Sequence, residues 1–356
     1  MGNTSGSSGF QDMMSFTLVE ALLGRRSRRF FMGAEIPDGV YLLDMREAPA
    51  FVDRAEDGSL SVDDFVEHVR KRVRKIQDAR LRAPSEVPFS EPHNTWVFNK
   101  PSTLVVIPVG DLAQHVLAGL CYDLQNGVVF QDDVNRRTIP GLNKYRRLAN
   151  VDNPLPLTFL EQWSLAEVTV ELSTSCYAGA LMLQAMGLGG WMLNGVDPFA
   201  LLGASGGHEV PGLGFRYGKD DRWPYPNPTG LEGVMAGYCP LHFPDMRAAL
   251  EAFCERKFGP GGPYHHDTPG PCRASRLVRS AAQVHDEPFR ECIALQAQYV
   301  YDTFGKFPGT VPSMFVIMVL QAYHVDLDFY DTFYKPGAYL TTHAEHLSKW
   351  HSKAPA

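Results

Sequence analysis

The sequence predicts a globular protein that combines α-helices with β-strands, in one elaborated domain or two. Its hydrophobic content of 44% and its charged content of 21% are ordinary for a soluble globular protein. Residues 103–107 form an apolar run that is typical of a strand buried on both faces. Residues 161–186 carry apolar side chains at close to helical spacing and form the longest helix candidate. With 356 residues, the chain can bury a substantial core.

In the first half of the chain, turn residues separate short apolar runs from longer amphipathic ones. Residues 39–43 are expected to form a short strand, and residues 61–79 an amphipathic helix that begins at a capping serine. After a proline-rich stretch, residues 96–98 are expected to form another strand. Residues 112–124 are expected to form a helix, which leads into an irregular, charge-rich stretch as far as Pro156.

In the second half of the chain, the pattern is mainly helical. The longest helix is expected to end at Gly187, because glycine readily adopts the left-handed conformation that closes a helix. Residues 243–258, 286–304 and 312–323 are expected to form three further helices. Segments rich in glycine and proline separate them, and no internal repeat is visible.

Charge, hydropathy and cysteine content argue against several classes of function. A net charge of −7 argues against a dedicated nucleic-acid-binding protein, which normally has a basic excess. The best apolar run, residues 314–320, is far shorter than the roughly 20 residues that a membrane span requires. The six cysteines are scattered without a C-x-x-C pair, which is typical of free thiols in a reducing compartment. We therefore expect a cytoplasmic protein that binds neither nucleic acid nor membrane.

The most informative stretch is residues 25–31, which gather four arginines around one serine. A guanidinium group presents a planar fork of donors that suits phosphate oxygens, and a serine hydroxyl adds another donor. In an extended segment, Arg25, Ser27 and Arg29 would share one face. The stretch is therefore a candidate phosphate site, and the alternative is a solubilising basic turn after a helix.

Residues 25–31 resemble the opening of the nitroreductase-like family of flavin enzymes, in which an N-terminal helix runs into an Arg-x-Ser-x-(Arg/Lys)-x-aromatic pattern. In that family the two basic residues and the serine bind the phosphate and ribityl part of FMN. The resemblance therefore implies cofactor-binding roles for Arg25, Ser27 and Arg29, together with the neighbouring Arg26.

A second match follows the longest helix, where glycines lead into an apolar strand that turns at Asn194-Gly195. The residues alone are equally compatible with a helix-to-strand connection that binds nothing, since Asn-Gly is a general turn signal. In the family, the backbone of this region lies against the flavin ring near its reactive N5. The resemblance implies cofactor contacts from Gly189, Asn194 and Gly195, although many relatives have Glu where this chain has Asn194.

Two weaker matches complete the series. Asn94 stands where the family has an asparagine that contacts the flavin, although the Gln-Pro pair that follows it in relatives is missing here. Residues 237–240, Gly-Tyr-Cys-Pro, resemble a Gly-Tyr-Pro found late in the family. All four segments occur in the family's order.

The resemblance implies an α+β fold with a mostly antiparallel central sheet flanked by long helices, and an FMN-dependent oxidoreductase. It implies a ping-pong cycle in which NAD(P)H reduces the flavin and a small organic acceptor, such as a nitro compound, a quinone or a biosynthetic intermediate, takes up the electrons. It also implies a homodimer with FMN at the subunit interface, and it assigns no catalytic side chain. On this basis the chain divides into a flexible N-terminus (1–14), an FMN-binding domain (15–242) and a mainly helical C-terminal extension (243–356).

Two alternatives remain open. The first is a protein of the same fold that binds a ligand without flavin, and the second is a metal-dependent enzyme built on the C-terminal histidines. His343 and His346 would share a helical face, as a metal-binding pair does. Partly exposed histidines in a helical extension are the simpler interpretation, so no metal ligand is predicted.

Overall fold

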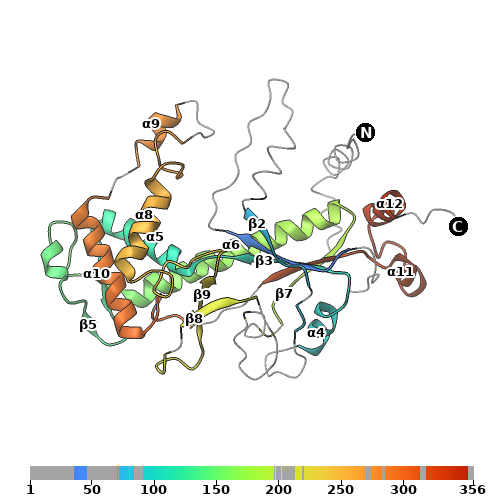
Figure 1. Ribbon diagram of the computed structural model, residues 1–356, viewed down its shortest axis with the longest axis horizontal. Coiled ribbons are helices and arrows are strands. Elements are labelled where there is room, and N and C mark those ends of the chain that lie inside the picture. Colours follow the sequence, from blue (N-terminus) through green and yellow to red (C-terminus); the bar gives the residue numbers. More distant parts are fainter. Residues whose placement is uncertain are drawn as a thin grey trace.

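The computed structural model is an α+β protein, with a β-sheet towards one end and a group of packed helices towards the other (Figure 1). This confirms the expected fold class. The basic stretch that contains Arg25, Arg26, Ser27 and Arg29 lies outside the described residues. The structure describes residues 36–45, 70, 72–79, 81–83, 91–195, 197, 202, 213–218, 220–268, 274–282, 285–312 and 318–351.

The main sheet has five strands in the order β2-β1-β3-β10-β7. Strand β1 runs parallel to β3, and the other three pairings within this sheet are antiparallel. The middle of the sheet is apolar, as expected for the run around residues 103–107. The strands are β1 (Gly39–Asp44), β2 (Val73–Gln77), β3 (Leu104–Val109), β7 (Gly189–Leu193) and β10 (Val319–Tyr323).

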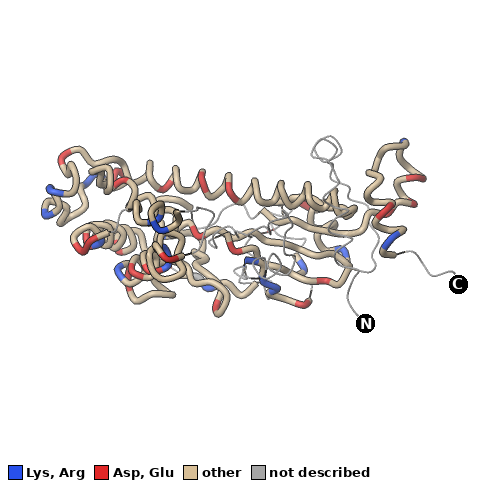
Figure 2. The backbone as a smooth tube through the Cα atoms, turned by 90° about the horizontal axis from the view of Figure 1, so that it is seen from above, with Lys and Arg blue, Asp and Glu red and all other residues tan. Residues whose placement is uncertain are grey.

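Helices cover both faces of this sheet because successive side chains of a strand point to opposite sides. On one face, Leu320 and Ala322 of β10 pack in a cluster with residues of α6 (Leu157–Ala185). On the other face, Val319 and Tyr323 pack in a cluster with residues of α4 (Pro92–Phe98). Helix α6 runs along one long side of the molecule and joins the sheet to the packed helices (Figure 2).

The packed helices form the largest hydrophobic core among the described residues, to which the first half of α6 also contributes. An aspartate caps each of the three main helices, and its side chain accepts hydrogen bonds from the backbone of the first turn. These helices are α5 (Leu112–Gln125), α8 (Met246–Phe258) and α10 (Glu287–Phe304). The smaller elements around them are β4 (Phe130–Asp132), β5 (Arg137–Thr138), η1 (Leu142–Tyr145), β6 (Leu155–Pro156) and α9 (Ser275–Arg279).

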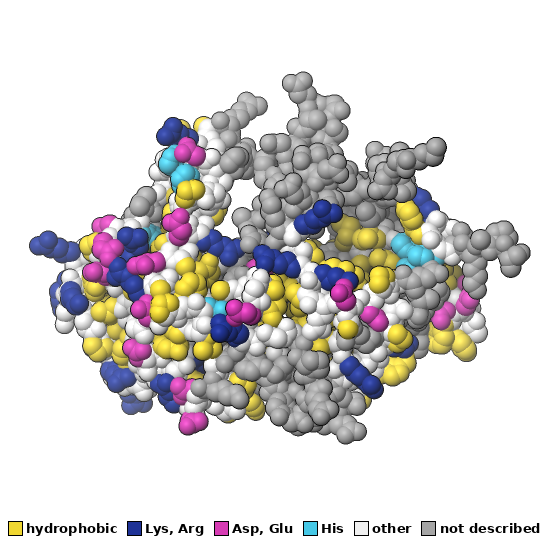
Figure 3. Space-filling model, viewed as in Figure 1, with side chains coloured by type: hydrophobic (Ala, Val, Ile, Leu, Met, Phe, Trp, Pro, Cys, Tyr) yellow, Lys and Arg dark blue, Asp and Glu magenta, His cyan; other side chains and the backbone are white. Residues whose placement is uncertain are grey.

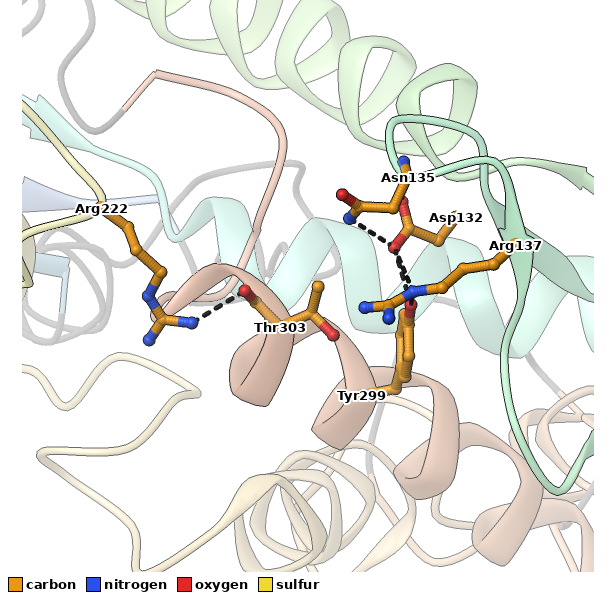
Figure 4. A network of polar contacts seen from close by, with 6 residues as sticks. All are labelled: Asp132, Asn135, Arg137, Arg222, Tyr299 and Thr303. Carbon is orange, nitrogen blue, oxygen red and sulfur yellow. Dashed lines mark hydrogen bonds and ion pairs between the residues drawn. The ribbon is translucent and has the colours of Figure 1, made fainter.

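A buried carboxylate ties the β4–β5 hairpin to α10 (Figure 4). Asp132 accepts hydrogen bonds from the hydroxyl of Tyr299 at 2.7 Å and from the side-chain amide of Asn135 at 2.7 Å. The Arg137 guanidinium donates to the same Tyr299 hydroxyl at 2.5 Å. Burial alone would raise the pKa of Asp132, but these donors outweigh it and lower that pKa. The Asp132 carboxylate therefore stays ionised at neutral pH, and the network serves as a structural link.

The structure corrects three local predictions. Residues 96–98 belong to helix α4, which begins at Pro92, a residue suited to the first turn of a helix. Residues 73–77, expected to continue a helix, form edge strand β2 beside β1. Residues 319–323, expected to end a helix, form β10 between β3 and β7.

The expected C-terminal extension, residues 243–356, therefore supplies a central strand of the main sheet as well as α8 and α10 of the helical core. No helix in the described part of the chain combines the length and hydropathy that crossing a bilayer requires. The remaining elements are β8 (Phe215–Gly218), β9 (Asn227–Leu231), α11 (Leu327–Phe333) and α12 (Thr341–Trp350).

Candidate functional site

Two of the sequence-predicted site segments, distant in the chain, come into contact in the structure. The backbone amide of Glu91, just before α4, donates to the carbonyl oxygen of Gly195 at 3.1 Å. A Cβ atom on Gly195 would collide with the side-chain amide of Asn94. Asn94 is half-buried and Asn194 is exposed, so this turn presents polar groups at an accessible surface.

The fourth predicted position, Gly189, has a packing role. It lies at the start of β7, and a Cβ atom on it would be 2.5 Å from the ring of Tyr323 and 2.8 Å from the side chain of Val325. Residue 189 is buried. Close packing between β7 and β10 is therefore sufficient to explain this glycine.

A cavity of about 200 Å³ lies at the same edge of the sheet as the Asn194-Gly195 turn. Strands β3 and β7 point in the same direction, because β10 between them is antiparallel to both. Their carboxyl ends therefore meet at one edge. The cavity wall begins at the carboxyl end of β3, continues through residues 110–113, and includes Met318 just before β10. The rest of the wall comes from β8 and β9, from residues 306–308 and 311–312, and from Leu172, Leu202, Leu213, Met235 and Cys239.

The most unusual side chain in the cavity wall is Lys306, which is 3% exposed. Its ammonium group donates hydrogen bonds to the carbonyl oxygens of Pro308, at 3.2 Å, and of Val311. It also lies 3.9 Å from the centroid of the Trp223 ring, a cation–π distance. Burial lowers the pKa of Lys306 to about 8, although the nearby charge of Glu161 acts in the opposite direction.

Glu161 on α6 holds the segment that follows Lys306. Its carboxylate is fully buried and accepts hydrogen bonds from the backbone amides of Gly309, at 2.8 Å, and Thr310, at 2.5 Å. The Thr310 hydroxyl donates to the same carboxylate at 2.6 Å. Burial raises the pKa of Glu161, while these donors and the ammonium of Lys306 oppose that rise. This side of the cavity is therefore anchored to the longest helix.

The cavity wall also contains Asp111, the capping residue of α5. One carboxylate oxygen accepts from the backbone amide of Ala113 at 3.0 Å, and the other accepts from that of Tyr238 at 3.0 Å. Residues 237–240, the last segment matched by sequence, thus contact this site through Tyr238. Cys239 also lines the cavity, and burial raises the pKa of its thiol, so it is not an activated nucleophile.

Sequence reasoning selected the Asn94 and Asn194-Gly195 segments but missed Lys306 and Glu161. Neither of these two residues belongs to a recognisable motif, and only their burial and partners single them out. No family model matches the chain, and comparisons with curated proteins and with solved structures find no match either. Function is therefore inferred from the residues and their geometry.

Proposed function

We propose that the protein is an FMN-dependent oxidoreductase of nitroreductase-like fold, which passes electrons from NAD(P)H to a small organic acceptor. The observation that carries the proposal is the contact between Asn94 and Gly195. These are the described residues that the family resemblance assigns to the flavin ring from two distant parts of the chain. Packing of α4 against β7 through Val97, Phe98 and Leu193 brings the segments together, and the match between the residues that meet and the family's flavin-contacting positions supports the proposal.

The described residues around the Asn194-Gly195 turn suit the flavin ring of FMN. A side-chain amide such as that of Asn94 can both donate to and accept from the polar edge of a flavin ring. The exposure of Asn194 leaves its side of the turn accessible. When bound, FMN would supply the hydride and electron transfer chemistry, and the protein would supply orientation and electrostatics. The phosphate would bind to Arg25, Ser27 and Arg29, which lie outside the described residues.

The cavity at the same edge of the sheet supports a small, largely apolar acceptor. Most of its wall is apolar, including Val109, Phe215 and Met235. Lys306 adds a positive charge, since an amine with a pKa of about 8 is mainly protonated at neutral pH. Such a wall favours an aromatic or quinone-like group that carries, or acquires, negative charge.

The proposed enzyme is a homodimer, and the outer face of α6 supports this. Phe159, Trp163, Val170 and Met182 are between 53% and 65% exposed along one helix. Helix α6 occupies one long side of the molecule, where a second copy can pack against it (Figure 2). Several large apolar side chains exposed on one long helix make it a candidate interaction surface.

Titration of the purified full chain with FMN tests the cofactor. We expect saturable binding of one FMN per chain, visible as absorbance near ~450 nm and as quenched flavin fluorescence. Arg25→Ala and Arg29→Ala should each weaken binding about tenfold or more, because a charge-assisted hydrogen bond contributes about 1.5–3 kcal/mol. Asn94→Ala should weaken it less, and His93→Ala, at an exposed neighbouring position of α4, is the matched control. Absence of saturable binding would refute the proposal.

The dimer is tested by light scattering coupled to size-exclusion chromatography. We expect the wild type to elute as a dimer and Trp163→Glu to shift it towards monomer, because a charge would be buried in the interface. Leu277→Glu, at a 75% exposed position on α9, is the control and should leave the dimer intact. A monomeric wild-type protein would contradict the assignment of this face.

A further inference from the structure

Three histidines from two separate elements meet beside α12. His324 directly follows β10, His346 lies on α12, and His351 is the residue at the end of that helix. The centroid of the His324 ring lies 5.2 Å from that of the His346 ring and 4.3 Å from that of the His351 ring. One ring nitrogen from each of the three lies within 4.8 Å of the others. Figure 3 shows histidine side chains gathered on the surface at this end of the molecule.

The scaffold that brings these rings together is well defined. The hydroxyl of Thr342, in the first turn of α12, donates to the carbonyl oxygen of Gln184 at the end of α6 at 2.8 Å. Gly187 adopts a φ of +76°, and a Cβ atom there would collide with the carbonyl oxygen of Thr342 and with His346. Helix α12 is therefore packed directly against the end of α6, next to the carboxyl end of β10.

His346 has a ring nitrogen that is available to a metal ion. Among the described residues, its Nε2 atom is buried without a hydrogen-bond partner. Buried polar atoms are normally satisfied, and a bound metal ion would satisfy this one.

We propose that His324, His346 and His351 form a binding site for one zinc-like divalent transition metal ion. Imidazole nitrogens suit zinc, copper and nickel, and the absence of carboxylates from this set of three disfavours magnesium and calcium. Zn–N bonds of about 2.0–2.1 Å in tetrahedral geometry separate the nitrogens by about 3.4 Å, so rotation of the half-buried His351 brings the ligands into range. Three histidines leave the fourth position to water.

This site is separate from the proposed flavin site. His324 follows the carboxyl end of β10, whereas Asn194 follows the carboxyl end of β7, and these two strands are antiparallel. The two sites therefore lie at opposite edges of the sheet. A metal ion here would join α12 to β10, and its binding does not depend on FMN.

The test is a zinc titration of the chelator-treated full chain, in competition with a chromogenic chelator and without flavin. We expect one Zn²⁺ per chain, and Co²⁺ in its place should give the intense visible absorption of a tetrahedral site. His346→Ala and His351→Ala should each weaken zinc binding at least about tenfold. His351 lies half-buried at the end of α12, so His351→Ala should still fold, which circular dichroism of the metal-free protein checks.

A second histidine pair provides the matched control. His265 and His266 are stacked neighbours on a loop, with Asp267 beside them, and in the described part of the chain they form the second group that could hold a metal ion. The double variant His265→Ala/His266→Ala should bind zinc as the wild type does. The proposal is overturned if no 1:1 binding is seen, if His351→Ala and His346→Ala retain full affinity, or if the control variant loses it.

Discussion

The buried ammonium group of Lys306 should make the stability of the protein depend on pH above neutrality. Its pKa is about 8 in the folded protein, against the ordinary lysine pKa of 10.5 that applies to the unfolded chain. Below pH 8 the amine is charged in both states, and the folded state alone bears the penalty of burying it. Above pH 10.5 the amine is neutral in both states and this penalty is gone. The free energy of unfolding should therefore rise by about 3 kcal/mol between these limits, at about 1.4 kcal/mol per pKa unit.

Replacing Lys306 with methionine should remove this rise. Methionine keeps an unbranched side chain over the Trp223 ring, but it loses the two hydrogen bonds to backbone carbonyls, at about 1 kcal/mol each. At pH 7 the removal of the buried charge, about 3 kcal/mol, outweighs this loss, so the variant should be more stable than the wild type by about 1 kcal/mol. At pH 10.5 the wild type has lost the charge too, and the variant should be less stable by about 2 kcal/mol.

Urea denaturation followed by circular dichroism at pH 7, 8, 9 and 10 measures this difference between Lys306→Met and the wild type. Other groups also titrate in this range, so the difference between the two proteins is the informative quantity. Lys335→Met, at an exposed position, is the control and should follow the wild type at every pH. If Lys306→Met and the wild type show parallel pH dependence, Lys306 is not desolvated and the reasoning is wrong.

Two further predictions concern packing and buried polar groups, and both are read from urea midpoints. Gly187→Ala should destabilise by about 3 kcal/mol or more, because a left-handed backbone costs alanine about 1–2 kcal/mol and the new Cβ collides with Thr342. Gly233 has a similar φ, +69°, with open space around it, so Gly233→Ala should lose only the about 1–2 kcal/mol of the left-handed backbone. Equal losses of stability in the two variants would contradict the steric argument. Gln321→Leu should cost about 2–3 kcal/mol, because it leaves the buried Trp191 indole N–H, which donates to Gln321 at 2.8 Å, without its acceptor. Trp191→Phe combined with Gln321→Leu should then lose less than the sum of the two single variants.

The long helices and strands β1 and β3 could be predicted from the sequence, but strands β2 and β10 could not. Helix α6, Leu157–Ala185, agrees closely with the expected range of 161–186, because a long apolar periodicity is a local signal. Strand β10 has only five residues, and its identity comes from pairing with β3 and β7, which are distant in the sequence. The strand predicted for residues 96–98 was wrong for a similar reason: three apolar residues fit either a strand or a helical turn, and the pattern is too short to decide.

The candidate site follows the same division. Asn94 and Asn194-Gly195 could be selected as separate motifs, but their contact is a tertiary contact that the spacing of residues in the sequence does not predict. The histidines show the limit more sharply. The sequence suggested pairing His343 with His346, yet His343 is fully buried, and its Nδ1 accepts from the backbone of Leu340 at 2.9 Å. The histidines that lie beside His346 are instead His324, which precedes it in the chain, and His351, which follows it.

The C-terminal third of the chain explains why both proposed sites depend on long-range structure. Without β10, strands β3 and β7 have no shared neighbour, and their carboxyl ends have no reason to meet at one edge. The same third carries Lys306 in the cavity wall, and the end of β10 carries His324 to α12. One antiparallel strand thus orients the Asn194-Gly195 turn at one edge of the sheet and the histidine cluster at the other. The segment that looked like an extension in the sequence is what relates the two sites to each other.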